Sequence, residues 1–175
     1  DLTVEAEAFG AEIIFPENEV PSVSGRLLAD EAAIDALEIP ALNKGRIAQY
    51  LKANMLTAKN ITDRPVLAGC IGPYSLAGRL YDMSEIMMLI YINPEAANTL
   101  LRKCTDFIIR YCMALKATGV NGVVMAEPAA GLLSNEDCLQ YSSVFVKEIV
   151  EKVQNDTATT EIYTLSLHDA LPISG

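Results

Sequence analysis

The residue whose position says most about chemistry is Glu127, because it directly follows a run that reads as a buried strand, residues 120–126, VNGVVMA. Pro128 keeps the backbone of Glu127 extended, and the small residues after it leave room for a ligand. In parallel α/β folds, ligands bind at the carboxyl ends of the strands. Glu127 could therefore bind a cationic or hydroxyl group or act as a general base. The alternative is that it accepts hydrogen bonds from loop amides and only shapes the loop.

A second unit of the same kind lies upstream, where the predicted strand 65–70, PVLAGC, runs into residues 71–79, IGPYSLAGR. The backbone amides of Gly72 and Ser75 lie near a predicted helix start, which is typical of an anion site. Arg79 follows one helical turn later and could bind a carboxylate or phosphate through its planar guanidinium. The segment has neither the GK[ST] of a phosphate loop nor the GxGxxG of a dinucleotide site. The alternative is a tight turn with a solvated arginine.

A third polar group follows the first apolar segment. Residues 11–15, AEIIF, predict a short strand that Pro16 ends, and Glu17 comes next. Glu17 would then lie at the same end of the sheet as Gly72 and Glu127, and these three residues are expected to share one rim. The alternative is a charged, solvated loop.

The elements that must position these residues alternate between strands and helices, which predicts parallel βα units and an α/β fold. Apolar residues at spacings of three and four predict the helices. Asp30, Ser84, Asn93 and Ser134 are the expected N-caps, and Gly119 is expected to end the longest helix. The predicted helices span residues 30–37, 46–59, 74–80, 84–91, 93–118 and 134–153.

Composition limits the possible partners. With 175 residues and 51% hydrophobic content, the chain is globular in composition and can bury a core. A formal charge of −10 argues against nucleic acid and anionic membrane surfaces as partners, because both require clustered basic residues. No apolar run reaches the roughly 18 residues that span a bilayer. We therefore predict a cytoplasmic protein whose partners are small molecules or basic protein surfaces.

The cysteines show no metal-ligand spacing. Cys70, Cys104, Cys112 and Cys138 form no CxxC pair and have no histidine beside them. We predict that they are small buried residues, with Cys70 a partial exception because it ends a strand on the expected functional face. No metal site is predicted from these residues.

Residues 65–77, PVLAGCIGPYSLA, together with residues 125–134, MAEPAAGLLS, resemble the uroporphyrinogen decarboxylase superfamily. This superfamily includes the decarboxylase of haem synthesis and the methylcobamide:coenzyme M methyltransferases, and the likeness covers about residues 1–157. It implies a (β/α)8 barrel with its site at the carboxyl ends of the strands, lined here by Glu127 and Tyr74. Because such a barrel usually needs about 250 residues, the chain is expected to be an interior fragment, roughly the N-terminal to central half of the barrel.

The resemblance extends to two branches of the superfamily. In the decarboxylase, an aspartate follows the first strand where this chain has Glu17, and a substrate-binding tyrosine falls nearest Arg79, with Tyr81 out of register. The methyltransferases match better, notably in residues 4–10, VEAEAFG, and 63–66, DRPV. The resemblance thus implies methyl transfer from a methylated corrinoid protein to a small thiol. The alternatives are decarboxylation of a porphyrinogen, without metal or cofactor, and a non-catalytic fragment that serves as a binding or scaffold module.

The resembling methyltransferases hold zinc through a His-x-Cys pair and a later cysteine, which would be expected after Val153. Residues 164–174 instead resemble a translated sequencing adapter, and we predict a barrel domain over 1–157 followed by a non-native tail over 158–175. His168, the only histidine, is followed by Asp169 and Ala170, so it does not match the zinc motif. Zinc is therefore expected only in the missing half, and the fragment is expected to bind no cofactor and to be inactive.

Overall fold

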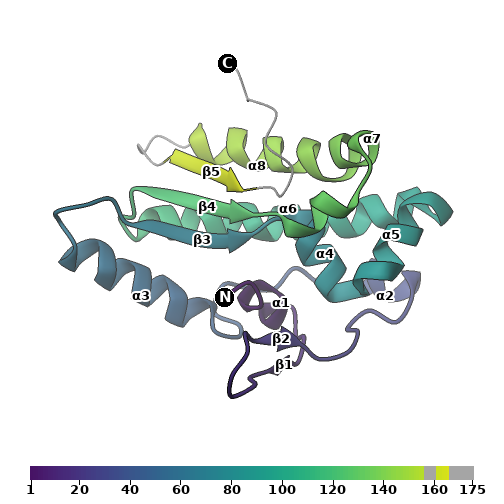
Figure 1. The fold of residues 1–175 in the computed structure, drawn as a ribbon, viewed down its shortest axis with the longest axis horizontal. Helices are drawn as coiled ribbons and strands as arrows, with labels where there is room; N and C mark the ends of the chain where they lie inside the picture. Colours follow the sequence, from purple (N-terminus) through teal and green to yellow (C-terminus); the bar gives the residue numbers. More distant parts are fainter. Residues whose placement is uncertain (156–160, 166–175) are drawn as a thin grey trace.

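The parallel sheet is the centre of the fold. A computed structural model of the chain describes residues 1–155 and 161–165, with the side chains of the first range only. Three parallel strands pair in the order β3-β4-β5 and leave the sheet open rather than closed into a barrel (Figure 1). Their bounds are β3 (Leu67–Ile71), β4 (Gly122–Ala126) and β5 (Glu161–Leu165). The predicted parallel βα units are confirmed. The strand β5 falls within the predicted tail, 158–175. His168 lies outside the described residues.

The crossover between β3 and β4 is built from three helices, α4 (Pro73–Tyr81), α5 (Met83–Ile92) and α6 (Pro94–Ala117). Figure 1 shows α6 lying across one face of β3 and β4. The α6 stripe that contacts the core is fully buried, as its spacing predicts; its members include Leu100, Leu101, Cys104, Phe107, Ile108, Cys112 and Leu115. Asn93 caps α6 by accepting a hydrogen bond from the Ala96 amide at 3.1 Å, as predicted.

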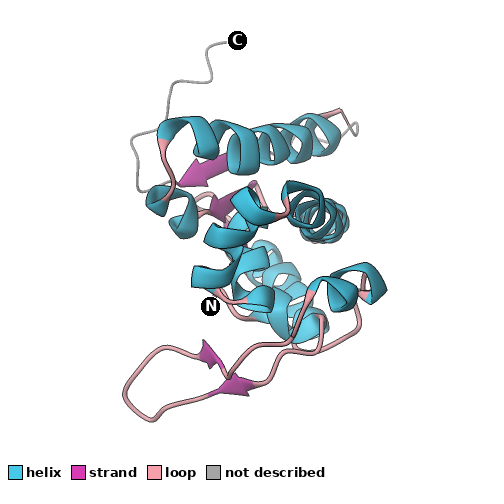
Figure 2. Cartoon of the chain, turned by 90° about the vertical axis from the view of Figure 1, so that its right-hand side faces the viewer, coloured by secondary structure: helices cyan, strands magenta, loops and turns pink. Residues whose placement is uncertain are grey.

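The N-terminal segment does not join the parallel sheet. It contains α1 (Val4–Ala8), the two short strands β1 (Ile13–Ile14) and β2 (Ser22–Val23), α2 (Glu31–Ala36) and α3 (Ile47–Asn60). Within residues 1–155 and 161–165, the strands β1 and β2 pair only with each other, antiparallel, and their loop projects away from the helical layers (Figure 2). The expectation that residues 11–15 form a strand of the same sheet as β3 is wrong, because alternating apolar residues indicate a strand without indicating its partner.

Two helix boundaries also differ from the prediction. Asp82, not Ser84, caps α5: its Oδ1 accepts hydrogen bonds from the amides of Ser84 at 2.9 Å and Glu85 at 3.3 Å. Asp82 has φ 90°, which turns the chain sharply from α4 into α5. The helix predicted over 134–153 is divided into α7 (Asn135–Cys138), a π-helical turn (Leu139–Ser143) and α8 (Val144–Gln154), while its predicted cap, Ser134, is confirmed. A 3-10 turn over Pro128–Leu132 precedes it.

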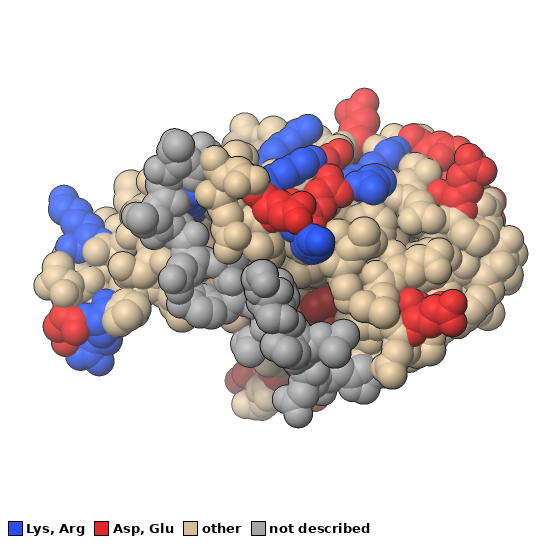
Figure 3. Space-filling view, turned by 90° about the horizontal axis from the view of Figure 1, so that it is seen from above, with Lys and Arg blue, Asp and Glu red and all other residues tan. Residues whose placement is uncertain are grey.

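The surface over α8 carries charges of both signs, as Figure 3 shows. Glu148 pairs there with Arg102 and, at 2.9 Å, with Lys152. The described residues on this face thus form no continuous basic track of the kind that binds nucleic acid. Within the described ranges, no helix is both long enough and apolar enough to cross a membrane.

The cysteines are buried as predicted, except Cys138, which is half-buried. The Sγ atoms of Cys70 and Cys112 lie 3.8 Å apart in the core between β3 and α6. The hydrogen bond with Cys112, together with burial, raises the pKa of the Cys70 thiol well above its ordinary value. Cys70 is therefore held as a thiol, which disfavours a nucleophilic role.

Candidate functional site

Glu127 is buried at the carboxyl end of β4, with 3% of its surface exposed. Its Oε1 accepts a hydrogen bond from the Ser75 amide, in the first turn of α4, at 2.6 Å. Its Oε2 is buried and has no hydrogen-bond partner in the part of the chain that the structure describes. A carboxyl group with one oxygen fixed and the other uncommitted has capacity left for a ligand or a proton.

Gly72 brings the end of β3 against this carboxyl group. Its amide donates to the Ala126 carbonyl at 2.8 Å, which extends the β3–β4 ladder by one step. A Cβ atom on Gly72 would lie only 1.4 Å from Oε2 of Glu127. The backbone of Gly72, with φ −83°, is one that any residue can adopt, so space alone requires glycine here. The two strand ends thus meet, as expected for Gly72 and Glu127.

Ser75 forms hydrogen bonds that link the connection after β3 to the connection after β4. Its amide binds Glu127, and its Oγ accepts a hydrogen bond from the Ala129 amide at 3.0 Å. The amides of Gly72 and Ser75, expected to bind an external anion, are therefore both used within the protein. The anion site predicted at this helix start is filled by the protein's own carbonyl and carboxyl groups.

Burial changes the acidity of Glu127. Removal from water raises the pKa of its carboxyl group to about 8, because the Ser75 backbone and side chain and the Tyr74 backbone offset only part of the desolvation. At neutral pH the group is mostly protonated, so Oε2 can carry a proton and donate it. A carboxyl group that titrates near neutral pH is suited to general acid–base chemistry.

The other predicted site residues lie in different surroundings. Tyr74 is fully buried beside Ser75, and its hydroxyl has no partner within residues 1–155. Arg79 is half-buried, and desolvation lowers the pKa of its guanidinium while the charge of Glu5 raises it. Glu17 is exposed in the loop between β1 and β2. The expectation that Glu17 shares the rim is corrected, because its strand belongs to the separate two-stranded sheet.

Glu5 is a functional candidate that sequence reasoning missed. It lies on α1 with 1% of its surface exposed, and its Oε1 accepts a hydrogen bond from the Ile71 amide at 3.0 Å. Its Oε2 is also buried without a partner among the described residues, and burial raises the pKa of its carboxyl group. The signal in the sequence was the placement of Glu5 between Val4 and Ala6, both buried, in a segment of small apolar residues.

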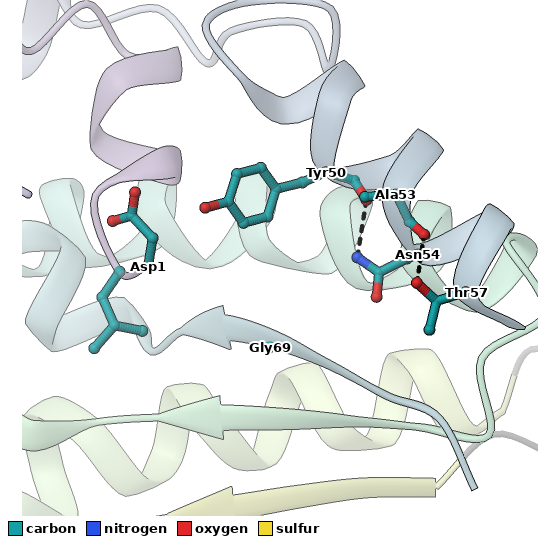
Figure 4. A pocket seen from close by; sticks show the side chains of 7 residues that line it. Asp1, Tyr50, Ala53, Asn54, Thr57 and Gly69 are labelled. Atoms are coloured by element: carbon teal, nitrogen blue, oxygen red, sulfur yellow. Dashed lines mark hydrogen bonds between the residues drawn. The ribbon is translucent and has the colours of Figure 1, made fainter. Parts of the chain in front are cut away.

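No metal centre is formed by the described residues, in which no three His, Cys, Asp or Glu side chains come together. Zinc therefore does not fit the part of the chain that surrounds Glu127. A separate pocket of about 300 Å³ lies between α3 and β3 (Figure 4). Two of its polar side chains bind their own helix, Asn54 to the Tyr50 carbonyl and Thr57 to the Ala53 carbonyl, both at 2.9 Å. They do not form a converging set of ligand-binding groups.

Comparison with known proteins reveals the family. The model of the uroporphyrinogen decarboxylase (URO-D) family matches residues 1–166. A methylcobamide:CoM methyltransferase MtbA from Methanosarcina mazei is 30% identical over 164 residues, covering 91% of this chain and 48% of that protein. A uroporphyrinogen decarboxylase from Legionella pneumophila is 26% identical over 162 residues, covering 89% of this chain and 46% of that protein. The chain spans about half the length of the curated relatives it matches.

A solved structure described as a methyltransferase from Methanosarcina mazei superimposes with a TM-score of 0.81 at 26% identity. The match covers 94% of this chain and 49% of the other. Together with the open parallel sheet, it confirms the predicted fold class, an α/β fold that forms part of a (β/α)8 barrel. The chain belongs to the uroporphyrinogen decarboxylase family.

Proposed function

We propose that the whole protein transfers a methyl group from a methylated corrinoid protein to a small thiol. The observation that carries the proposal is the buried Glu127 carboxyl group, whose pKa of about 8 lies close to that of an ordinary thiol, about 8.5. A base of matched pKa is well suited to take the thiol proton. The similarity to methyltransferases from Methanosarcina mazei supports the same reaction.

In this reaction the ionised form of Glu127, the minor form at neutral pH, accepts the proton of the thiol. The sulfur then forms a bond to the methyl carbon, and the carbon–cobalt bond breaks with its electron pair left on cobalt. The residues of this chain contribute the proton acceptor and its surroundings: Ser75 orients the carboxyl group, and Gly72 leaves the space it occupies. The buried site strengthens each of these interactions because water is excluded.

Porphyrinogen decarboxylation is the second candidate, supported by decarboxylase relatives of similar identity. By resemblance, that reaction uses an acidic residue after the first strand. Glu17, which follows β1, is exposed in a loop of the separate hairpin. This placement favours methyl transfer.

The test uses the complete protein with methylcobalamin and 2-mercaptoethanesulfonate, and follows loss of the methylcobalamin absorption spectrum. Glu127→Gln keeps the shape of the side chain and removes the base, so we expect the rate to fall by about 10²- to 10⁴-fold. Glu12→Gln, at an exposed position, is the matched control. A protein that leaves methylcobalamin unchanged but releases carbon dioxide from uroporphyrinogen would overturn the proposal in favour of the second candidate. Absence of both reactions would indicate a non-catalytic module.

A further inference from the structure

Glu5 forms a hydrogen bond at the edge of β3 that has no neighbouring strand in the described sheet. Successive backbone amides of a strand point to opposite sides. Because the Gly72 amide points toward β4, where it binds the Ala126 carbonyl, the Ile71 amide points toward the other edge. There it binds Oε1 of Glu5. A helix side chain thus supplies the acceptor that a neighbouring strand would otherwise provide.

We propose that Glu5 is a positioning residue for Glu127. One continuous path of contacts joins them: Glu5 binds Ile71, the next residue, Gly72, lies against Oε2 of Glu127, and Ser75 binds Oε1. Because the Gly72 backbone closes one side of the carboxyl group, displacement of Ile71 opens that side to water. Glu5 therefore maintains the desolvated surroundings on which the acid–base role of Glu127 depends.

The surroundings of Glu5 leave the bond to Ile71 as its anchor. The other acids of this segment, Asp1 and Glu7, both pair with Arg46, with the Glu7 contact at 2.6 Å. The cationic groups that act on Glu5 are Arg79 on α4 and the N-terminus, and neither forms an ion pair with it within the described ranges. On the core side, the hydrogen bond with Cys112 and burial raise the pKa of Cys70, and burial raises the pKa of Tyr111; the charge of Glu5 adds to both shifts.

Two substitutions separate the hydrogen bond from the charge. Glu5→Gln retains an oxygen that can accept from Ile71 and removes the charge, whereas Glu5→Asp retains the charge on a side chain that is one carbon shorter. We expect Glu5→Asp to lower the pKa of Glu127 by a unit or more, at least about a tenfold change in proton affinity. We expect Glu5→Gln to leave it unchanged. Glu7→Asp, on the same helix, is the matched control.

The measurement is an infrared pH titration of the complete protein labelled with ¹³C-glutamate, in which the band of Glu127 is identified by its loss in Glu127→Gln. An unchanged titration in Glu5→Asp would overturn the proposal, and so would a shift in Glu5→Gln that equals or exceeds the shift in Glu5→Asp. The inference rests on the role proposed for Glu127, but the readout is protonation rather than methyl transfer. Failure of the positioning role is therefore distinguishable from failure of the proposed function.

Discussion

Replacement of Gly72 by alanine tests the contact between the two strand ends most directly. The added Cβ would lie 1.4 Å from Oε2 and 2.4 Å from Cδ of Glu127. Side-chain carbons almost never come closer than 3.0 Å to such atoms, so Oε2 has to retreat by at least the difference, 1.6 Å. A displacement of this size is incompatible with the 2.6 Å hydrogen bond from Ser75 to Oε1. We expect the carboxyl group to leave its site.

The expected free-energy change combines three effects. Overpacking a filled site costs about 1 to 3 kcal/mol. Loss of the Ser75 hydrogen bond in a buried setting costs a further 1 to 3 kcal/mol or so. The smaller entropy of the unfolded alanine chain offsets roughly 0.4 to 1 kcal/mol. The net expectation is that Gly72→Ala lowers the free energy of unfolding by about 1 to 5 kcal/mol.

The assay is urea unfolding of the complete protein at pH 5.5, followed by circular dichroism. At that pH Glu127 is mostly protonated in the folded state and mostly ionised in the unfolded chain, so part of the measured difference reflects its ionisation. Gly69→Ala is the matched control, because it lies on the same strand and an added Cβ there meets no atom within 4 Å. We expect Gly69→Ala to change the free energy of unfolding by less than about 0.5 kcal/mol.

A double-mutant cycle separates the clash from other effects. Glu127→Ala removes the atoms at 1.4 and 2.4 Å and leaves its own Cβ at 3.1 Å from the new methyl group. The cost of Gly72→Ala should therefore shrink in the Glu127→Ala background, with a coupling energy of about 0.5 to 3 kcal/mol. The reasoning is refuted if Gly72→Ala is as stable as the parent, or if its cost is the same in both backgrounds.

Three further predictions concern residues around the site. The pKa of Glu127 rises from 4.5 to about 8 on burial, so the stability contributed by its bound proton is complete below pH 4.5 and is lost as the pH rises to 8. The total loss is on the order of 5 kcal/mol. The urea midpoints of the parent and Glu127→Gln should diverge over this pH range, and parallel curves would contradict the assignment. Ser75→Ala leaves the buried Ala129 amide without its acceptor and should lower the free energy of unfolding by about 1 to 3 kcal/mol; unchanged hydrogen exchange at Ala129 would show that the bond is unimportant. Asp82→Ala removes the cap of α5 and places alanine at φ 90°, so it should lower the free energy of unfolding by about 1 to 2 kcal/mol or more. Asp82→Asn should lower it less, as measured by thermal melts. Equal losses of stability in the two variants would argue against the cap.

Much of the fold follows from local patterns in the sequence. The caps at Asp30, Asn93 and Ser134 were predictable because a short polar side chain before an apolar repeat satisfies the first helical amides. The parallel pairing of β3 and β4 was predictable from the intervening helices. The cap at Asp82 was not, since it depends on a positive φ at the junction of α4 and α5, which no local pattern in the sequence indicates.

The candidate site was predictable only in part, and for a physical reason. The position of a carboxylate after an apolar strand sufficed to place Glu127 at the carboxyl edge of the sheet, with Gly72 and Ser75 at the neighbouring connection. The burial of Glu127, its bond to Ser75 and the resulting pKa depend on atoms more than 50 residues apart in the chain. The same holds for Glu5, whose partner Ile71 lies 66 residues away, and for Glu17, which lies in the loop of the separate β1–β2 hairpin. Local residue types determined which groups could do chemistry, whereas tertiary packing decided which of them lost their water, because desolvation depends on everything that surrounds a group.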